Sequence, residues 1–172
     1  MTKIYEPAED SFLLCDFLKK TIKDTNISFL DMGCGSCIVA DTAKEIEVSH
    51  IVCADINPKA VETAQQKGYK AMQSDLFQHI KGTFDIICFN APYLPYDERE
   101  PKDSQIATTG GKKGDEIPVR FIKEAKEHLN KGDTIYLLIS SLTPMNNLKQ
   151  FNPETVATKK ISHEELIILK IQ

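Results

Sequence analysis

The fold of this chain is decided by residues 28–37, which read Ser28-Phe29-Leu30-Asp31-Met32-Gly33-Cys34-Gly35-Ser36-Cys37. Residues 28–32 form a short, mainly apolar run of the kind found in strands that are buried on both faces. The glycines at positions 33 and 35 then let the backbone turn sharply and approach a ligand closely. A dinucleotide-binding G-x-G-x-x-G motif would need a third glycine at position 38, which holds Ile38. The segment therefore predicts a strand, a ligand-binding loop and a helix, but not a nicotinamide site.

The rest of the chain alternates between strand-like and helix-like segments. Short apolar runs at 50–56, 84–89 and 134–142 predict further buried strands. Apolar residues at helical spacing over 14–22 and 117–129 predict helices, and Asn57-Pro58 is a good start for another helix over 59–67. Strands that alternate with helices give a parallel sheet covered on both faces. The short segment 145–151 leads to two strand-like runs, 154–161 and 165–171, which we expect to pair as an antiparallel hairpin at a sheet edge.

The composition is that of one ordinary globular domain. The chain has 172 residues, 41% of them hydrophobic, and a formal net charge of −4. No apolar run approaches the roughly 18 residues of a membrane span, and residues 1–7 turn acidic where a signal peptide would turn apolar. We therefore expect a cytoplasmic protein and no membrane contact.

The cysteines and arginines exclude two further classes of protein. The five cysteines are odd in number, and Cys34-x-x-Cys37 lacks a second pair or histidines at ligand spacing, so we expect neither disulfides nor a metal site. Only Arg99 and Arg120 are arginine among the 21 basic residues. Because duplex binding depends on clustered Lys and Arg, direct nucleic-acid binding is a poor first interpretation.

Acidic residues follow the first strands of the predicted sheet, at the edge where such sheets bind ligands. Asp31 suits a cationic ligand group better than a phosphate. Asp55 lies 22 positions after Gly33, the usual distance for a carboxylate that accepts the ribose hydroxyls of a nucleoside. Asp75 could accept from an adenine amine while Ile56 and Leu76 pack against the ring. Each of these residues taken alone could be a turn former, but three in register favour a nucleoside site.

The fourth loop, Asn90-Ala91-Pro92-Tyr93, follows the predicted strand 84–89. Asn and Pro both punctuate strands, so the segment could be a simple turn. It could also bind an NH₂ group, because the Asn90 side-chain oxygen and the Ala91 carbonyl can accept two N–H bonds while Tyr93 stacks on the amide plane.

These motifs resemble the HemK family of class I, S-adenosylmethionine-dependent methyltransferases. The resemblance covers almost the whole chain, and it is closest to the archaeal and eukaryotic branch in the opening heptad, Tyr5-Glu6-Pro7-Ala8-Glu9-Asp10-Ser11. It also includes the glycine loop, Asp55, Asp75, the loop at 90–93 and Gly110-Gly111-Lys112-Lys113-Gly114. The family implies a doubly wound, mostly parallel seven-stranded Rossmann-like sheet with a C-terminal antiparallel hairpin. We expect a single domain over 1–172, with an N-terminal motif and helix (1–25), a cofactor-binding and catalytic core (26–142) and the hairpin (143–172).

The resemblance also implies an activity and a role for each motif. The family methylates the glutamine side chain of the Gly-Gly-Gln motif in class 1 release factors. Carried over to this chain, Asn90, Ala91, Pro92 and Tyr93 would bind the substrate glutamine and carry the catalysis. The cofactor would be held by Ser11, Asp31, Gly33, Gly35, Asp55, Ile56, Asp75 and Leu76.

The same resemblance implies a protein partner. Bacterial members carry an N-terminal helical domain that recognises the release factor, and we expect no room for one in 172 residues. The archaeal and eukaryotic members instead work as heterodimers with a small zinc-binding activator protein. An exposed sheet edge near the second and third strands would suit such a partner.

Two departures from the family pattern leave alternatives open. Ala91 stands where proline is usual, which removes one fixed φ angle, and Cys37 stands where the loop usually has glycine. A non-catalytic, cofactor-binding subunit is therefore one alternative. Methylation of the adenine amine in DNA or RNA, which uses a similar Asn-Pro-Pro-Tyr loop, is the other; the mild acidity of the chain argues against it.

Overall fold

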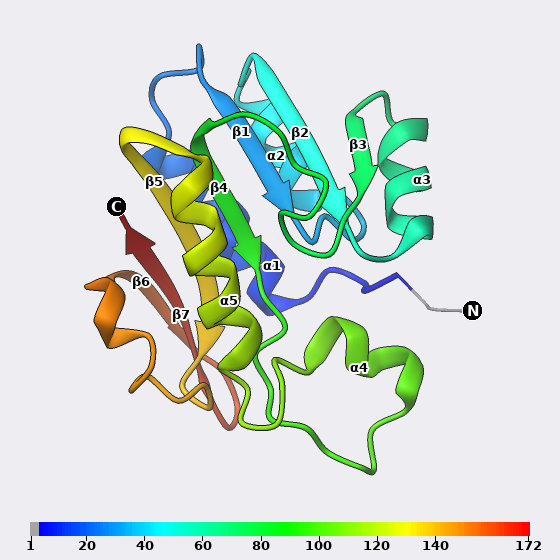
Figure 1. Ribbon diagram of the computed structural model, residues 1–172, viewed down its shortest axis with the longest axis vertical. Helices are drawn as coiled ribbons and strands as arrows, with labels where there is room; N and C mark the ends of the chain where they lie inside the picture. The colour runs from blue at the N-terminus through cyan, green and yellow to red at the C-terminus, as the bar shows by residue number, and fades with distance from the viewer. Residues whose placement is uncertain (1–3) are drawn as a thin grey trace.

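The computed structural model describes residues 4–172, with the backbone alone at positions 102, 103 and 106, and it shows a seven-stranded sheet between helices (Figure 1). Residues 1–3 of the predicted N-terminal segment lie outside the described part. The strands are β1 Ser28–Met32, β2 His50–Asp55, β3 Lys70–Gln73, β4 Phe84–Asn90, β5 Leu129–Ser140, β6 Glu154–Lys160 and β7 Glu165–Ile171. The helices are α1 Glu9–Thr21, α2 Ile38–Glu45, α3 Pro58–Gln66, α4 Lys102–Thr108 and α5 Glu116–Ala125, with 3-10 turns η1 Lys126–His128 and η2 Lys149–Phe151.

The strand order is β3-β2-β1-β4-β5-β7-β6, which confirms the predicted doubly wound sheet. Strands β1 to β5 run parallel, whereas β7 is antiparallel to both β5 and β6. The predicted C-terminal hairpin is therefore present, and its second strand is inserted between β5 and β6. The order reverses between β1 and β4, so the carboxyl ends of these two strands are where such a sheet binds ligands.

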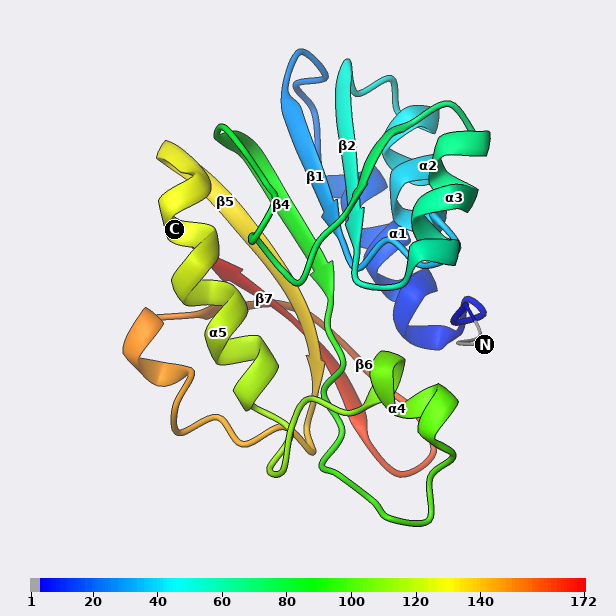
Figure 2. The same ribbon diagram turned by 45° about the vertical axis from the view of Figure 1, so that its right-hand side comes forward.

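Helices cover both faces of the sheet (Figures 1 and 2). On one face, Phe121 and Ile122 of α5 are completely buried, and on the other, Leu14 and Leu18 of α1 are. Each of these side chains contributes about 1.5–3 kcal/mol by leaving water. The helical spacing of apolar residues in the sequence thus corresponds to real buried faces. Within the described part, no helix is both long and apolar enough to cross a membrane.

Three predicted boundaries are wrong around α5 and β5: the end of the helix and both ends of the strand. The helix predicted over 117–129 ends at Ala125, and η1 follows it before β5 begins at Leu129. The first residues of β5 are exposed, so they lack the apolar signature that the prediction relied on. At the other end β5 stops at Ser140, and Leu142, predicted to be in the strand, is 49% exposed. Helix α4 was not predicted, because its sequence has no apolar stripe.

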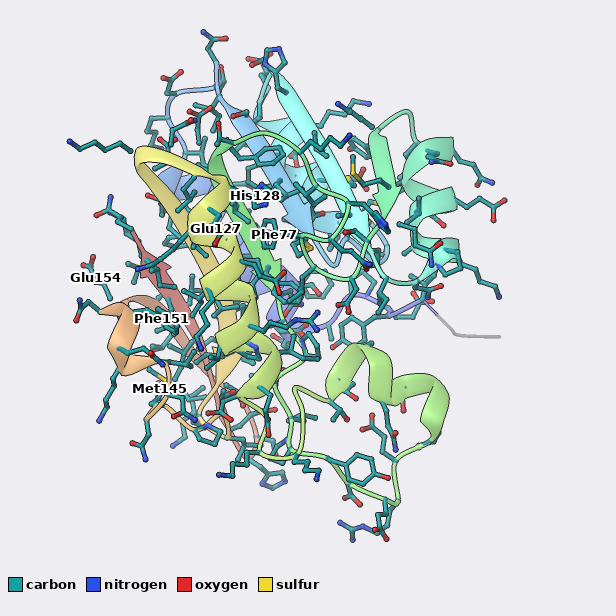
Figure 3. All side chains as sticks on the ribbon, viewed as in Figure 1. Phe77, Glu127, His128, Met145, Phe151 and Glu154 are labelled. Atoms are coloured by element: carbon teal, nitrogen blue, oxygen red, sulfur yellow. The ribbon has the colours of Figure 1, made fainter. Side chains whose placement is uncertain are left out.

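The loop after β3 is anchored on α5 and η1 by aromatic stacking. The ring of Phe77 stacks on His128 with 4.8 Å between centroids, and the two residues lie side by side in Figure 3. Phe77 also stacks on Phe121 at 5.7 Å. These contacts fix the position of Asp75 and Leu76, which lie just before Phe77 in the same loop.

Candidate active site

The loops at the carboxyl ends of β1, β2, β3 and β4 enclose a cavity of about 510 Å³, here called the central pocket. This volume lies within the roughly 300–1,000 Å³ of small-molecule sites. The central pocket is lined by every site residue expected from the sequence: Ser11, Asp31, Gly33, Gly35, Asp55, Ile56, Asp75, Leu76, Asn90, Ala91, Pro92 and Tyr93.

The glycine loop lies against the end of β4. Gly33 has a φ of 64°, and a Cβ added there would meet Cε2 of Phe89 at 2.7 Å. Only glycine combines this backbone conformation with so little space. The loop backbone is tied to β2 by the Cys34 amide, which donates to the Ala54 carbonyl at 3.1 Å. The sequence signal of two glycines therefore reflects both a left-handed turn and close packing.

Cys37 adopts the left-handed conformation that glycine usually supplies, with a φ of 69°. It is fully buried and does not line the central pocket, so its side chain leaves the cavity open. It packs instead with Cys34 and Cys53 in a small cluster of thiols. Among the described residues, no group of three or more His, Cys, Asp or Glu side chains is arranged to hold a metal ion.

Asp31 is a buried carboxylate at the end of β1. Its Oδ2 accepts from the amide of Ala40 in α2 at 3.0 Å, and the residue is 2% exposed. Burial raises the pKa of the Asp31 carboxyl well above its usual range, more than the Ala40 hydrogen bond lowers it. A cationic group in the pocket would stabilise the ionised form of this buried carboxylate, so Asp31 suits an ammonium ligand.

Asp55 is held rigidly at the end of β2. Its two oxygens accept from the amides of Gly35 and Asn57, each at 2.8 Å. Burial raises the pKa of Asp55, and these hydrogen bonds counteract part of the effect. Each carboxylate oxygen keeps a second acceptor site for a ligand hydroxyl. Ile56 follows Asp55, is 50% exposed and lines the same cavity.

Asp75 has a partner that sequence reasoning missed. It forms an ion pair with Arg120 of α5, whose guanidinium also lies 3.4 Å from Glu124. No sequence signal joins positions 75 and 120, because the two residues meet only when α5 packs beside β4. Leu76, which is 7% exposed, has a positive φ of 47°. The Ser74 hydroxyl donates to the Leu76 carbonyl at 2.7 Å and helps to hold this conformation.

Asn90 is oriented by a chain of hydrogen bonds from the N-terminal segment. Its Nδ2 donates to the hydroxyl of Ser11 at 3.4 Å, and that hydroxyl donates to Oδ1 of Asp10 at 3.2 Å. The phenol of Tyr5 donates to the other Asp10 oxygen, also at 3.2 Å. The Oδ1 atom of Asn90 is buried and has no hydrogen-bond partner among the side chains and backbone that the structure describes. The side chain thus presents an unused acceptor at the pocket. Sequence reasoning did not find the part played by Tyr5 and Asp10.

The loop after Asn90 is braced by the glycines that precede α5. A Cβ on Gly110 would lie 2.6 Å from the Pro92 carbonyl oxygen, and one on Gly114 would lie 2.7 Å from the Tyr93 carbonyl oxygen. Burial, together with nearby acidic groups, raises the pKa of Tyr93. Glycine at these two positions therefore allows the segment 110–114 to pack directly on the backbone of the candidate substrate loop.

This sheet order, with a two-glycine loop after β1 and an acidic residue at the end of β2, defines a class I methyltransferase. Residues 9–164 match the family described as "Methyltransferase small domain", and the relatives that follow show that the chain belongs to the HemK family. It is 39% identical to a Methanocaldococcus jannaschii protein named "Putative protein N5-glutamine methyltransferase". That match covers 97% of this chain and 90% of the relative. It is also 32% identical to the mouse protein "Methyltransferase HEMK2", in a match that covers 89% of this chain and 75% of the relative.

A solved structure gives the same fold. A ribosomal protein L11 methylase from Lactobacillus delbrueckii subsp. bulgaricus superposes with a TM-score of 0.69, covering 99% of this chain and 82% of that one. The sequences are 16% identical, so this likeness concerns the fold alone.

Proposed function

We propose that this methyltransferase transfers a methyl group from S-adenosylmethionine to the glutamine side chain of the Gly-Gly-Gln motif in a class 1 release factor. The observation that carries the proposal is the Asn90 side chain. Its nitrogen donates a hydrogen bond to Ser11, while its oxygen is buried at the central pocket without a partner among the described residues. An acceptor that is left buried without a partner is costly unless a ligand satisfies it, and a substrate NH₂ group would do so.

The residues of the pocket fit the proposed cofactor. The buried Asp31 would hold the ammonium group of its amino-acid end, and Asp55 would hold the ribose hydroxyls. Ile56 and Leu76 would pack against adenine, with Asp75 beside them. Gly33 and Gly35 keep the loop close without a Cβ in the way, and Ser11 reaches the same cavity. When bound, this cofactor supplies a sulfonium methyl group that is open to attack by a nucleophile.

The task of the protein is then to position a weak nucleophile. An amide nitrogen attacks poorly because its lone pair is delocalised. Asn90 Oδ1, with the Ala91 carbonyl, would accept its N–H bonds, and these hydrogen bonds strengthen as positive charge develops on nitrogen. Pro92 and Tyr93 would hold the amide plane. Positioning of this kind is worth several kcal/mol, about seven or more in ideal cases.

Support for a glutamine substrate comes from relatives and motifs. The Methanocaldococcus jannaschii relative is named for N5-glutamine methylation. The opening heptad and the loop at 90–93 resemble the branch that acts on release factors. In this structure these two segments meet through the hydrogen bond from Asn90 to Ser11.

The sheet also offers a docking place for the activator expected from the resemblance. Strand β3 is the terminal strand on one side of the sheet, paired with β2 alone in the described part of the chain. A small zinc-binding protein could add a strand there. Co-expression with candidate zinc proteins should yield a heterodimer, and a fully soluble, active single chain without any complex would contradict this partner.

Methylation of an adenine amine is the second candidate, because the oxygen of Asn90 would accept equally well from a base NH₂ group. The charge of the site disfavours it. The central pocket is lined by five carboxylates and by a single described cation, Arg120, which already pairs with Asp75. Duplex binding that weakens steeply with salt, or methylation of adenine, would favour this candidate over glutamine.

Replacing Asn90 tests the proposal against a non-catalytic role. We expect Asn90→Ala to abolish methyl transfer while cofactor affinity, measured by calorimetry, changes less than about twofold, because Asn90 contacts the substrate side of the pocket. A wild-type protein that binds the cofactor but methylates nothing would identify a non-catalytic subunit. Full activity in Asn90→Ala would remove Asn90 from the mechanism.

A further inference from the structure

One carboxylate at the central pocket has no role in the mechanism so far. Glu164 lies in the turn between β6 and β7 and lines the pocket beside residues that are remote from it in sequence. Its Oε2 atom is buried, and no hydrogen-bond partner for it is found in the described part of the chain. A buried acceptor without a partner is destabilising, and more so when it is charged.

Two donors, the phenol of Tyr5 close to Glu164 and the ammonium of Lys159 in the same hairpin, are engaged elsewhere. The phenol of Tyr5 donates to Asp10 at 3.2 Å, and Lys159 of the same hairpin pairs with Glu9. No described residue therefore donates to the Glu164 oxygen, which is left as an acceptor for a ligand in the pocket.

The position of Glu164 indicates which ligand would supply that group. It lines the central pocket together with Tyr93 and Tyr5, and its charge adds to the effect of burial in raising the pKa of both phenols. Tyr93 belongs to the loop that begins at Asn90. Glu164 thus lies on the substrate side of the pocket, whereas Asp55 and Ile56 mark the side expected to hold the nucleoside.

We propose that Glu164 is a substrate-binding residue whose buried Oε2 accepts a peptide N–H from the segment that carries the target glutamine. This inference rests on the proposed function and extends it to substrate recognition. A glycine-rich segment is suited to such a contact, because without a Cβ its backbone N–H groups can approach a buried acceptor closely. The C-terminal hairpin would then take part in recognition as well as closing the sheet.

The test compares Glu164→Gln with Glu165→Gln, a matched control at the exposed neighbouring position. The wild-type protein and both variants are assayed on a Gly-Gly-Gln peptide and on the intact release factor, with cofactor affinity and thermal unfolding measured in parallel. Glutamine keeps the size of the side chain but removes the charge, and a hydrogen bond to a charged group is worth about tenfold or more in affinity. We expect Glu164→Gln to raise KM about tenfold with kcat within about twofold, and Glu165→Gln to match the wild type. Glu164→Asp, which withdraws the oxygen by one methylene, should also raise KM.

Three results would overturn the assignment. Equal KM values for all the proteins would show that Glu164 does not bind substrate. A loss of cofactor affinity in Glu164→Gln at unchanged KM would assign Glu164 to the cofactor instead. If the wild-type protein transfers no methyl group to glutamine, the proposed function itself fails, and the role of Glu164 in it fails too.

Discussion

Asp31 is the residue in which stability and cofactor binding oppose each other most directly. Burial raises its pKa well above the ordinary 3.8. At a pH between 3.8 and this raised pKa, the folded chain therefore holds a proton that the unfolded chain has released. The stabilising contribution of Asp31 is therefore complete below about pH 3.8 and is lost as the pH rises through the raised pKa. Above about pH 3.8 the burial of Asp31 therefore destabilises the cofactor-free protein relative to its unfolded chain.

We expect Asp31→Asn to unfold at a higher temperature than the wild type at pH 7.5 without cofactor, and the difference to shrink as the pH falls toward 4. The asparagine oxygen can still accept from Ala40, so the fold is preserved. The same variant should bind the cofactor about tenfold or more weakly, since a charge-assisted hydrogen bond is lost. Thermal unfolding measured across this pH range checks the expected stability, and calorimetry checks the expected cofactor affinity. A variant that is less stable at every pH and binds the cofactor normally would contradict this role.

At the scale of elements, the glycine segment 110–114 holds the candidate substrate loop in place. A Cβ on Gly110 would lie 2.3 Å from the Gly114 carbonyl oxygen and 2.6 Å from that of Pro92, and neither backbone atom can yield easily. We expect Gly110→Ala to displace the loop that follows Asn90, with a stability cost of about 1–3 kcal/mol and a much larger fractional loss of kcat than of cofactor affinity. Steady-state kinetics and calorimetry measure the two effects.

Gly132 provides the control for this substitution. It has a φ of 95°, but a Cβ there meets nothing within 4 Å, and it lies near the start of β5, away from the pocket. Gly132→Ala should therefore carry only the backbone cost of a positive φ and leave kcat unchanged. If both variants lose activity equally, the loss is a general effect of destabilisation and not a displaced loop.

Elements with a strong local signal could be predicted from the sequence. Asn57 caps α3 by accepting from the Lys59 amide at 3.1 Å, and Pro58 starts the helix, as that dipeptide indicates. The glycine loop and the C-terminal hairpin were equally visible. The pair Asp75–Arg120 and the chain Asn90–Ser11–Asp10–Tyr5 were not, because each joins residues from different elements. Such contacts depend on tertiary packing, which local periodicity does not encode.

The whole molecule is a sheet with an acidic pocket at its switch point. The carboxylates that line this pocket are Asp10, Asp31, Asp55, Asp75 and Glu164. The mild net charge of −4 is thus accompanied by a concentration of acidic groups where the substrate would enter. Such a surface repels phosphates and is compatible with a neutral or basic peptide. This is the molecular-scale reason to prefer a protein over nucleic acid as substrate.

The central claim is that the NH₂ group bound at Asn90 belongs to a glutamine side chain. Tandem mass spectrometry tests it most directly, after incubation of a class 1 release factor with S-adenosylmethionine and the wild-type chain, co-expressed with an activator where one is found. The account predicts one added methyl group on the glutamine of Gly-Gly-Gln, and none with Asn90→Ala. An active preparation that leaves this glutamine unmodified, or methylates adenine in an added oligonucleotide instead, would contradict it.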